Sequence, residues 1–209
     1  MLARFFDLLA ALRDAAPPDA EFLYDPATPE GALRLANLRR YLELTAGADT
    51  VLVGEAPGWR GATITGVPFM SVRELDARPG LLTGSAEGDG FARPDAPAAA
   101  WELSASVVQK ALRGWSRPPV NWPVYPNHPF RAPDRATNRP PRRPEVEAGA
   151  AVALELLRAL RPARVIAIGR KAEHALAAAG VAATPVRHPA QGGAAIFAAQ
   201  MAALGRERP

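Results

Sequence analysis

Apolar positions along the chain recur with two different periods, which predicts an alternation of helices and strands. Between residues 29 and 44, leucines and a tyrosine fall three or four positions apart, as on the buried side of an amphipathic helix. Thr50–Val53 and Arg164–Gly169 are instead short, nearly continuous apolar runs, as in buried parallel strands. The whole pattern predicts helices over 2–14, 29–44, 104–112, 145–160, 171–179 and 194–204, and strands over 50–54, 123–126, 164–169 and 183–186.

This order of elements predicts an α/β fold. Strands that alternate with helices form a parallel sheet with helices on both faces. We therefore expect a three-layer α/β/α sandwich around a mostly parallel, four-stranded sheet. Residues 58–98 are rich in Gly, Pro and Ala without clear periodicity, which predicts one long functional loop. A length of 209 residues, with no linker or repeat, favours a single domain over residues 1–209.

Three short segments containing Gly and Pro are the candidates for chemistry. Gly54-Glu55-Ala56-Pro57-Gly58 directly follows the first strand, Gly66–Phe69 comes soon after, and Arg187–Gly193 follows the last strand. Open α/β sheets bind ligands at the carboxyl ends of their strands, so Glu55 and His188 are expected at such a site. Taken alone, the first segment fits a Gly/Pro turn with a solvated glutamate equally well.

Together with Tyr125-Pro126-Asn127, these segments resemble the motifs of the uracil-DNA glycosylase superfamily. Their order and approximate spacing match over residues 48 to 200, and Gly54–Gly58 resembles the GEAPG motif of the bacterial and archaeal iron–sulfur branch. The resemblance implies a monofunctional DNA glycosylase of base-excision repair, which hydrolyses the N-glycosidic bond of uracil or a related deaminated base in DNA.

The resemblance also implies roles for individual residues. Phe69 would stack on the flipped base, and Asn127 would present its amide to the edge of uracil. His188 would donate a hydrogen bond to the uracil oxygen on which negative charge builds. Each role has a structural alternative, namely a core aromatic, a turn-forming amide and a packing histidine. The implied catalytic residues are Glu55 and His188, and the implied substrate-binding residues are Gly54, Ala56, Pro57, Gly58, Phe69 and Asn127.

Ala56 departs from the superfamily's best-known branch, which has an Asp at this position. Without that carboxylate, the attacking water would be positioned by Glu55, by a backbone carbonyl or by a residue of the loop 59–66. Two other functions are open. One, suggested by Ala56, is a non-catalytic nucleic-acid-binding relative, and the other is a hydrolase of free nucleosides or nucleotides, which the Gly-rich turns also support.

Charge favours an anionic partner. The net charge is +4, the isoelectric point is near 10.1, and 23 of the 25 basic side chains are arginines, whose guanidinium groups bind phosphate as forks. Five arginines crowd residues 131–143 with Asp134 as the only acid, so this stretch is expected to contact DNA phosphates or, alternatively, to be a solvated basic loop. The predicted DNA contacts are Arg131, Arg139, Arg142, Arg143, Arg187, Gln191 and Gly192.

The absence of certain residue types excludes several kinds of site. It has no cysteine, which excludes disulfides, thiolate nucleophiles and the cysteine-bound cluster of the iron–sulfur branch. No two of its three histidines have metal-ligand spacing, so no metal or other cofactor is expected. Asp7 interrupts the apolar N-terminal run, and no run approaches membrane-spanning length. We expect a soluble, cytoplasmic monomer that binds DNA and no membrane.

Overall fold

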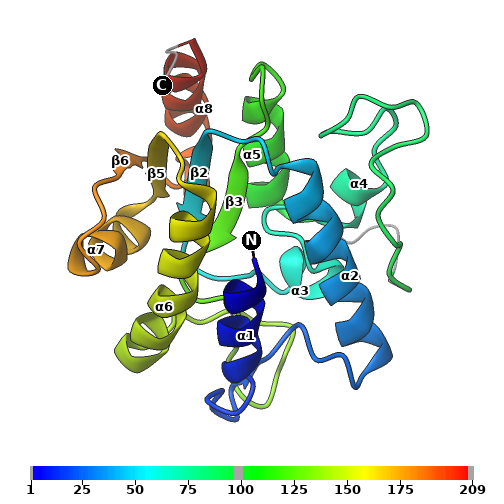
Figure 1. The fold of residues 1–209 in the computed structure, drawn as a ribbon, viewed down its shortest axis with the longest axis vertical. Coiled ribbons are helices and arrows are strands. Elements are labelled where there is room, and N and C mark those ends of the chain that lie inside the picture. Colours follow the sequence, from blue (N-terminus) through cyan, green and yellow to red (C-terminus); the bar gives the residue numbers. More distant parts are fainter. Residues whose placement is uncertain (1, 97–100, 207–209) are drawn as a thin grey trace.

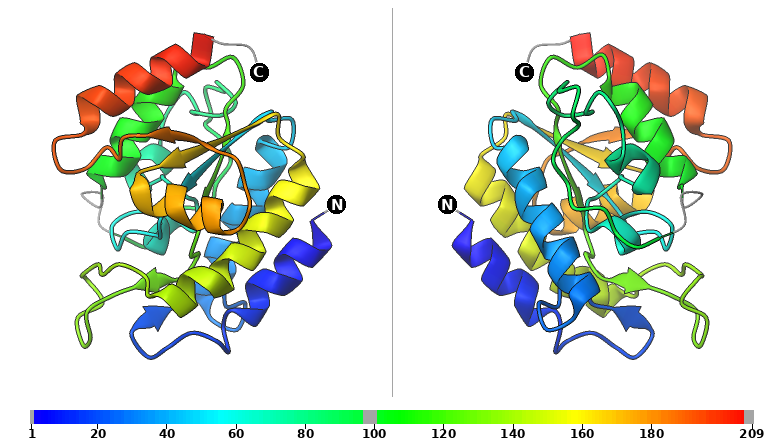
Figure 2. Two further views of the ribbon diagram at one scale, coloured as in Figure 1. Left: turned by 90° about the vertical axis from the view of Figure 1, so that its left-hand side faces the viewer. Right: turned by 90° about the vertical axis from the view of Figure 1, so that its right-hand side faces the viewer.

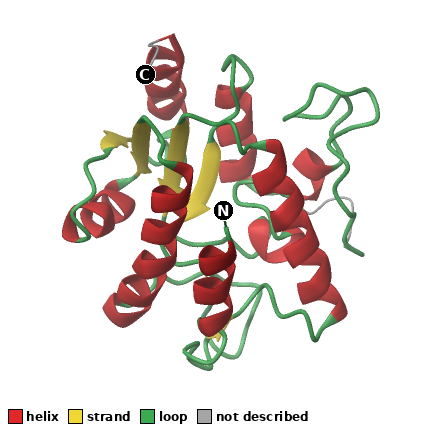
Figure 3. Ribbon diagram, viewed as in Figure 1, coloured by secondary structure: helices red, strands yellow, loops and turns green. Residues whose placement is uncertain are grey.

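A computed structural model describes residues 2–96 and 101–206 and is built around a parallel sheet (Figure 1). Its strands are β2 (Thr50–Gly54), β3 (Val120–Pro123), β5 (Arg164–Ile168) and β6 (Thr184–Val186), in the order β3-β2-β5-β6. All neighbouring strands in this sheet are parallel. Helices lie on both faces, which confirms the predicted three-layer α/β/α architecture with four strands (Figure 3).

Apolar side chains that point alternately to the two faces of the central strand β2 divide the core into two layers. Val51 and Val53 of β2 pack in one apolar cluster, whereas Leu52 between them packs in the other. Side chains of a strand point alternately to opposite faces, so one strand supplies both layers. Helices α5 and α8 cover the face of Leu52, and α1, α2, α6 and α7 cover the opposite face (Figure 2).

The helices agree closely with the sequence pattern. The predicted helix over 29–44 is α2, with the same bounds, and the Thr28 hydroxyl at its start accepts a hydrogen bond from the Gly31 N–H. The long helix α6 begins two residues before the predicted start, and α1 ends three residues before the predicted end. The described helices are α1 (Ala3–Ala11), α2 (Pro29–Leu44), α3 (Ala62–Thr65), α4 (Val72–Leu75), α5 (Leu103–Leu112), α6 (Arg143–Leu160), α7 (Arg170–Ala178) and α8 (Ala194–Arg206).

One strand was misplaced by the sequence pattern. The strand predicted over 123–126 is β3, which covers Val120–Pro123 and therefore ends where the prediction begins. The N–H groups of Val124 and Tyr125 still bond to the carbonyls of Gly54 and Glu55, so pairing with the chain after β2 continues. The error has a physical cause. Asn121 and Pro123 have the composition of a turn, but β3 is an edge strand, where proline is tolerated.

Two further features were not predicted. Residues 58–98 were expected to be loop, yet this stretch contains the short helices α3 and α4. In addition, β1 (Ala20–Glu21) and β4 (His128–Pro129) form a separate antiparallel pair. Within the described ranges, no helix is both long and apolar enough to cross a membrane.

Candidate functional site

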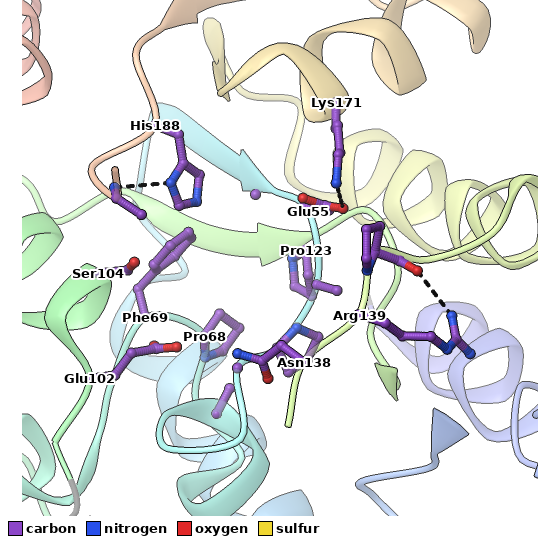
Figure 4. Close-up of a pocket in the computed structure, with 17 residues that line it drawn as sticks. Glu55, Pro68, Phe69, Glu102, Ser104, Pro123, Asn138, Arg139, Lys171 and His188 are labelled. Atoms are coloured by element: carbon purple, nitrogen blue, oxygen red, sulfur yellow. Dashed lines mark hydrogen bonds and ion pairs between the residues drawn. The ribbon is translucent and has the colours of Figure 1, made fainter. Parts of the chain in front are cut away.

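A cavity of about 310 Å³ opens at the carboxyl edge of the parallel sheet (Figure 4). This volume lies at the lower end of the range typical of small-molecule sites, about 300–1,000 Å³. Its walls come from the ends of β2 and β3, the starts of α5 and α7, and the loop after β6. The cavity brings together eight residues predicted from the sequence: Gly54, Glu55, Ala56, Pro57, Gly58, Phe69, Arg139 and His188.

Phe69 provides an aromatic surface in the cavity. It is partly exposed, whereas its neighbours from Thr65 to Met70 are buried. Its φ angle of 53° is unusual for a bulky residue, and the Gln109 side chain donates a hydrogen bond to its carbonyl at 3.1 Å. A Cβ atom on Gly54 would lie only 2.7 Å from the Phe69 ring. Glycine at this position therefore allows the ring to lie against the end of β2.

His188 presents one ring nitrogen for hydrogen bonding to a ligand. Its Nδ1 accepts a hydrogen bond from the Ala190 N–H at 3.1 Å, so in the neutral ring the proton is on Nε2. Burial lowers the pKa of His188, although the Glu55 carboxylate acts in the opposite direction. The lowered pKa keeps the ring neutral at pH 7. Among the described residues, Nε2 has no hydrogen-bond partner. The Nε2–H group is thus a free donor in the cavity.

Glu55 forms an ion pair at the opposite side of the cavity. Its Oε1 atom lies 2.7 Å from Nζ of Lys171, a residue in the first turn of α7 (Figure 4). The positive end of the α7 dipole adds to the attraction between this helix and the carboxylate. Within the described chain, Oε2 of Glu55 makes no hydrogen bond and is available to water or a ligand.

Glu102, immediately before α5, is a cavity residue that the sequence pattern did not indicate. Burial and, secondarily, the nearby Glu74 carboxylate raise its pKa from 4.5 to about 7. A Cβ atom on Gly58 or Gly61 would lie 1.9 or 2.4 Å from its carboxylate oxygens. The two glycines therefore leave room for the Glu102 carboxyl group, which packs against the loop after β2. No periodicity in the sequence could have shown this contact.

Asn127, predicted to bind the base, lies outside the cavity. It is fully buried, and its amide nitrogen donates to the Leu12 carbonyl and the Tyr125 hydroxyl, both at 3.3 Å. Because Leu12 is the C-cap of α1, Asn127 satisfies a helix end. The misplaced strand explains the discrepancy, since the edge of the sheet is reached at Pro123, four residues earlier.

A different asparagine, Asn138, lines the cavity. Its Oδ1 accepts hydrogen bonds from the Trp59 N–H at 3.0 Å and from His128 Nε2 at 3.2 Å. These two donors fix the orientation of the amide, whose nitrogen has no partner among the described residues. In Figure 4, Asn138 and Glu102 enter the cavity from different loops. Asn138 therefore offers the amide donor that was expected from Asn127.

The arginine-rich stretch 131–143 carries much less free charge than its sequence suggests. Arg139 is only 11% exposed and lies within 3.0 Å of both Asp19 and Glu145. Arg142 also pairs with Asp19, whose pKa is held well below its usual range by Arg142 and, despite burial, by Arg139. Arg143 pairs with Glu147 at 2.7 Å. These acids lie outside the stretch, so Asp134 is its only acid in sequence, but three of its arginines are paired with acids from elsewhere in the chain.

The remaining predicted DNA contacts lie at the surface. Arg131 is exposed, as are Arg187, Gln191 and Gly192 in the loop after β6. The Arg187 guanidinium donates to the Gln191 carbonyl at 3.4 Å, and Gln191 has a φ of 53°. None of these four residues lines the cavity. Their contacts with DNA stay predictions.

In the described part of the chain, no group of three His, Cys, Asp or Glu side chains is arranged to hold a metal ion.

No protein-family model matches the sequence, and no curated protein matches it. Among solved structures, the fold is similar to that of SMUG2 from Pedobacter heparinus, with a TM-score of 0.60 over 96% of each chain. Sequence identity is 12%, so the likeness is one of fold.

Proposed function

We propose that this protein is a DNA glycosylase that hydrolyses the N-glycosidic bond of uracil. One observation carries the proposal: a neutral histidine with a free Nε2–H and a partly exposed aromatic ring lie in the same cavity, at the carboxyl edge of the sheet. The similarity in fold to SMUG2, a member of the uracil-DNA glycosylase superfamily, supports a glycosylase.

In this proposal, Phe69 stacks on a base that has been flipped out of the DNA. Stacking of a base on an aromatic side chain contributes about 1–3 kcal/mol, which offsets part of the few kcal/mol that flipping costs. The free amide hydrogens of Asn138 donate to a carbonyl oxygen of uracil. Cytosine has an amino group where uracil has its second carbonyl, so an amide donor aimed at that position favours uracil.

His188 then stabilises the leaving group. When the bond between C1′ of the sugar and N1 of the base breaks, both electrons leave with the base, and negative charge collects on its carbonyl oxygens. A neutral Nε2–H donor aimed at one of these oxygens stabilises the anion more than the intact base. Donors of this kind contribute a factor of about 10²–10³ to the rate.

Glu55 acts on the other product of bond cleavage, the sugar cation. Lys171 holds Oε1 of the carboxylate, and Oε2 accepts a hydrogen from the attacking water. The water oxygen bonds to C1′, its proton passes to Glu55 and then to solvent, and the uracil anion takes a proton from solvent. Glu55 thereby takes the role of the Asp that the superfamily's best-known branch has at the position of Ala56. General-base catalysis of this kind contributes a factor of about 10²–10⁴ to the rate.

The proposal is tested with an end-labelled oligonucleotide carrying one uracil, in single- and double-stranded form. We expect free uracil and an alkali-sensitive abasic site, and no product from the matching thymine oligonucleotide. His188→Ala should slow excision by about 10²-fold or more. His174→Ala, which changes an exposed histidine on α7, is the matched control and should excise uracil at the normal rate.

The two alternative functions give different results in the same assay. A hydrolase of free nucleosides would release uracil from deoxyuridine faster than from DNA. A non-catalytic relative would bind the oligonucleotide without releasing any base, and the His188→Ala variant would then bind DNA like the unaltered protein.

A further inference from the structure

We propose that a basic groove between α4 and α5 binds a single strand of DNA beside the cavity. The basic groove is lined by the cationic side chains of Arg73, Arg78, Lys110 and Arg113 together with Trp101, and has a volume of about 870 Å³. Its function as a DNA track rests on the proposed glycosylase activity, but its affinity for a DNA strand is measurable without that activity.

The four cations of the basic groove are free to bind an anion. All four are exposed, and none of them forms an ion pair with another described residue. The one acid in the lining, Glu74, is 7% exposed, and its two carboxylate oxygens accept hydrogen bonds from Ser71 and Ser106. The groove therefore has a net positive charge, in contrast to stretch 131–143, where Arg139, Arg142 and Arg143 are paired with acids.

Trp101 distinguishes a single strand from other anions. It is 41% exposed although it is a large apolar side chain, and it lies among the cations. A positively charged groove combined with an aromatic side chain is the arrangement by which proteins bind single-stranded nucleic acid, because unpaired bases stack on the ring. In a duplex the faces of the bases are covered, and an acidic peptide has no aromatic base to stack.

The basic groove begins directly beside the cavity. Trp101 precedes Glu102, which lines the cavity, and consecutive Cα atoms are about 3.8 Å apart. From there the groove follows α5, a helix of ten residues and so about 15 Å long, to Arg113 at its C-cap. A strand in the groove would thus deliver one nucleotide to the cavity while its neighbours contact the cations.

The test uses fluorescence anisotropy with a uracil-free single-stranded oligonucleotide at several salt concentrations. The variant Lys110→Gln/Arg113→Gln should flatten the plot of log affinity against log salt by about 1.4, since each phosphate contact to a single strand contributes about 0.7. The matched control is Arg4→Gln/Arg161→Gln, which removes the same charge from exposed positions on α1 and after α6 and should leave the slope unchanged.

A second variant tests the stacking. Trp101→Ala should weaken binding of the single strand about 5- to 150-fold, and Trp101→Phe should retain most of the affinity.

Equal slopes for both double variants would overturn the proposal, as would unchanged affinity of Trp101→Ala. Poly-glutamate binding that depended equally on Trp101 would identify an acidic protein as the partner and would also overturn it. Because no uracil is present, a failure here is separate from a failure to excise uracil.

Discussion

Glu102→Gln should make the protein more stable at neutral and alkaline pH, and not in acid. Burial and the Glu74 carboxylate raise the pKa of Glu102 to about 7 in the folded protein, whereas 4.5 is its usual value. The unfolded chain therefore loses the proton near pH 4.5, but the folded protein holds it until about pH 7. Folding stability is therefore lost as the pH rises from about 4.5 to 7, and a glutamine, which is always neutral, avoids this loss.

The size and pH window of the effect follow from these two values. Each tenfold difference in proton affinity corresponds to 1.36 kcal/mol, so the full difference corresponds to roughly 3 kcal/mol. The side chain keeps some contact with solvent, which reduces this figure, and we expect about 2 kcal/mol. The advantage of the variant should be absent below pH 4.5, grow between pH 4.5 and 7, and stay constant above pH 7.

Urea denaturation of both proteins at pH 4, 5.5, 7 and 8.5 measures this difference. Comparing the two proteins at each pH cancels the titration of all other groups. Glu43→Gln, at an exposed position on α2 that forms no ion pair with another described residue, is the matched control and should show no trend. A difference between Glu102→Gln and the unaltered protein that does not vary with pH would refute the assignment of a buried, neutral carboxyl group to the cavity.

Further substitutions test other cavity residues and compare them with Asn127, which lies outside the cavity. Phe69→Ala should raise KM about 5- to 150-fold through lost stacking, measured by steady-state kinetics. Asn138→Asp should reduce the preference for uracil over cytosine, because a carboxylate accepts but does not donate. Asn127→Asp should instead lower the free energy of unfolding by several kcal/mol, seen in urea denaturation, and leave the base preference unchanged, since it buries a charge away from the cavity. Lys171→Met should lower kcat more than it changes KM, as Glu55 loses the partner that orients it.

The sheet and most helices could be predicted from the sequence because their patterns are local. The bounds of α2 follow from its apolar stripe and from Thr28 and Pro29 at its start. The run before Gly54 has the composition of a buried strand. By contrast, β3 contains Asn121 and Pro123, and only its position at the edge of the sheet makes these residues acceptable.

The candidate site was predictable where a residue lies just after a strand or within one of the short Gly/Pro segments. Glu55 and His188 lie within two residues of a strand end, Phe69 ends the segment Gly66–Phe69, and the structure brings all three to the same cavity. Glu102 and Asn138 depend on contacts with the loop after β2, far away in the sequence, and gave no local signal. The same holds for Arg139, whose partner Asp19 precedes it by 120 residues. Long-range pairing of this kind cannot be inferred from composition.

A single-turnover measurement of uracil release, with protein in excess over a uracil-containing oligonucleotide, decides whether the protein is a uracil-DNA glycosylase. We expect release of free uracil and formation of an abasic site, at least about 10²-fold faster than with His188→Ala and as fast as with His174→Ala. Excision at the same rate by His188→Ala and by the unaltered protein, or no excision by the unaltered protein when the oligonucleotide is bound, would contradict this expectation.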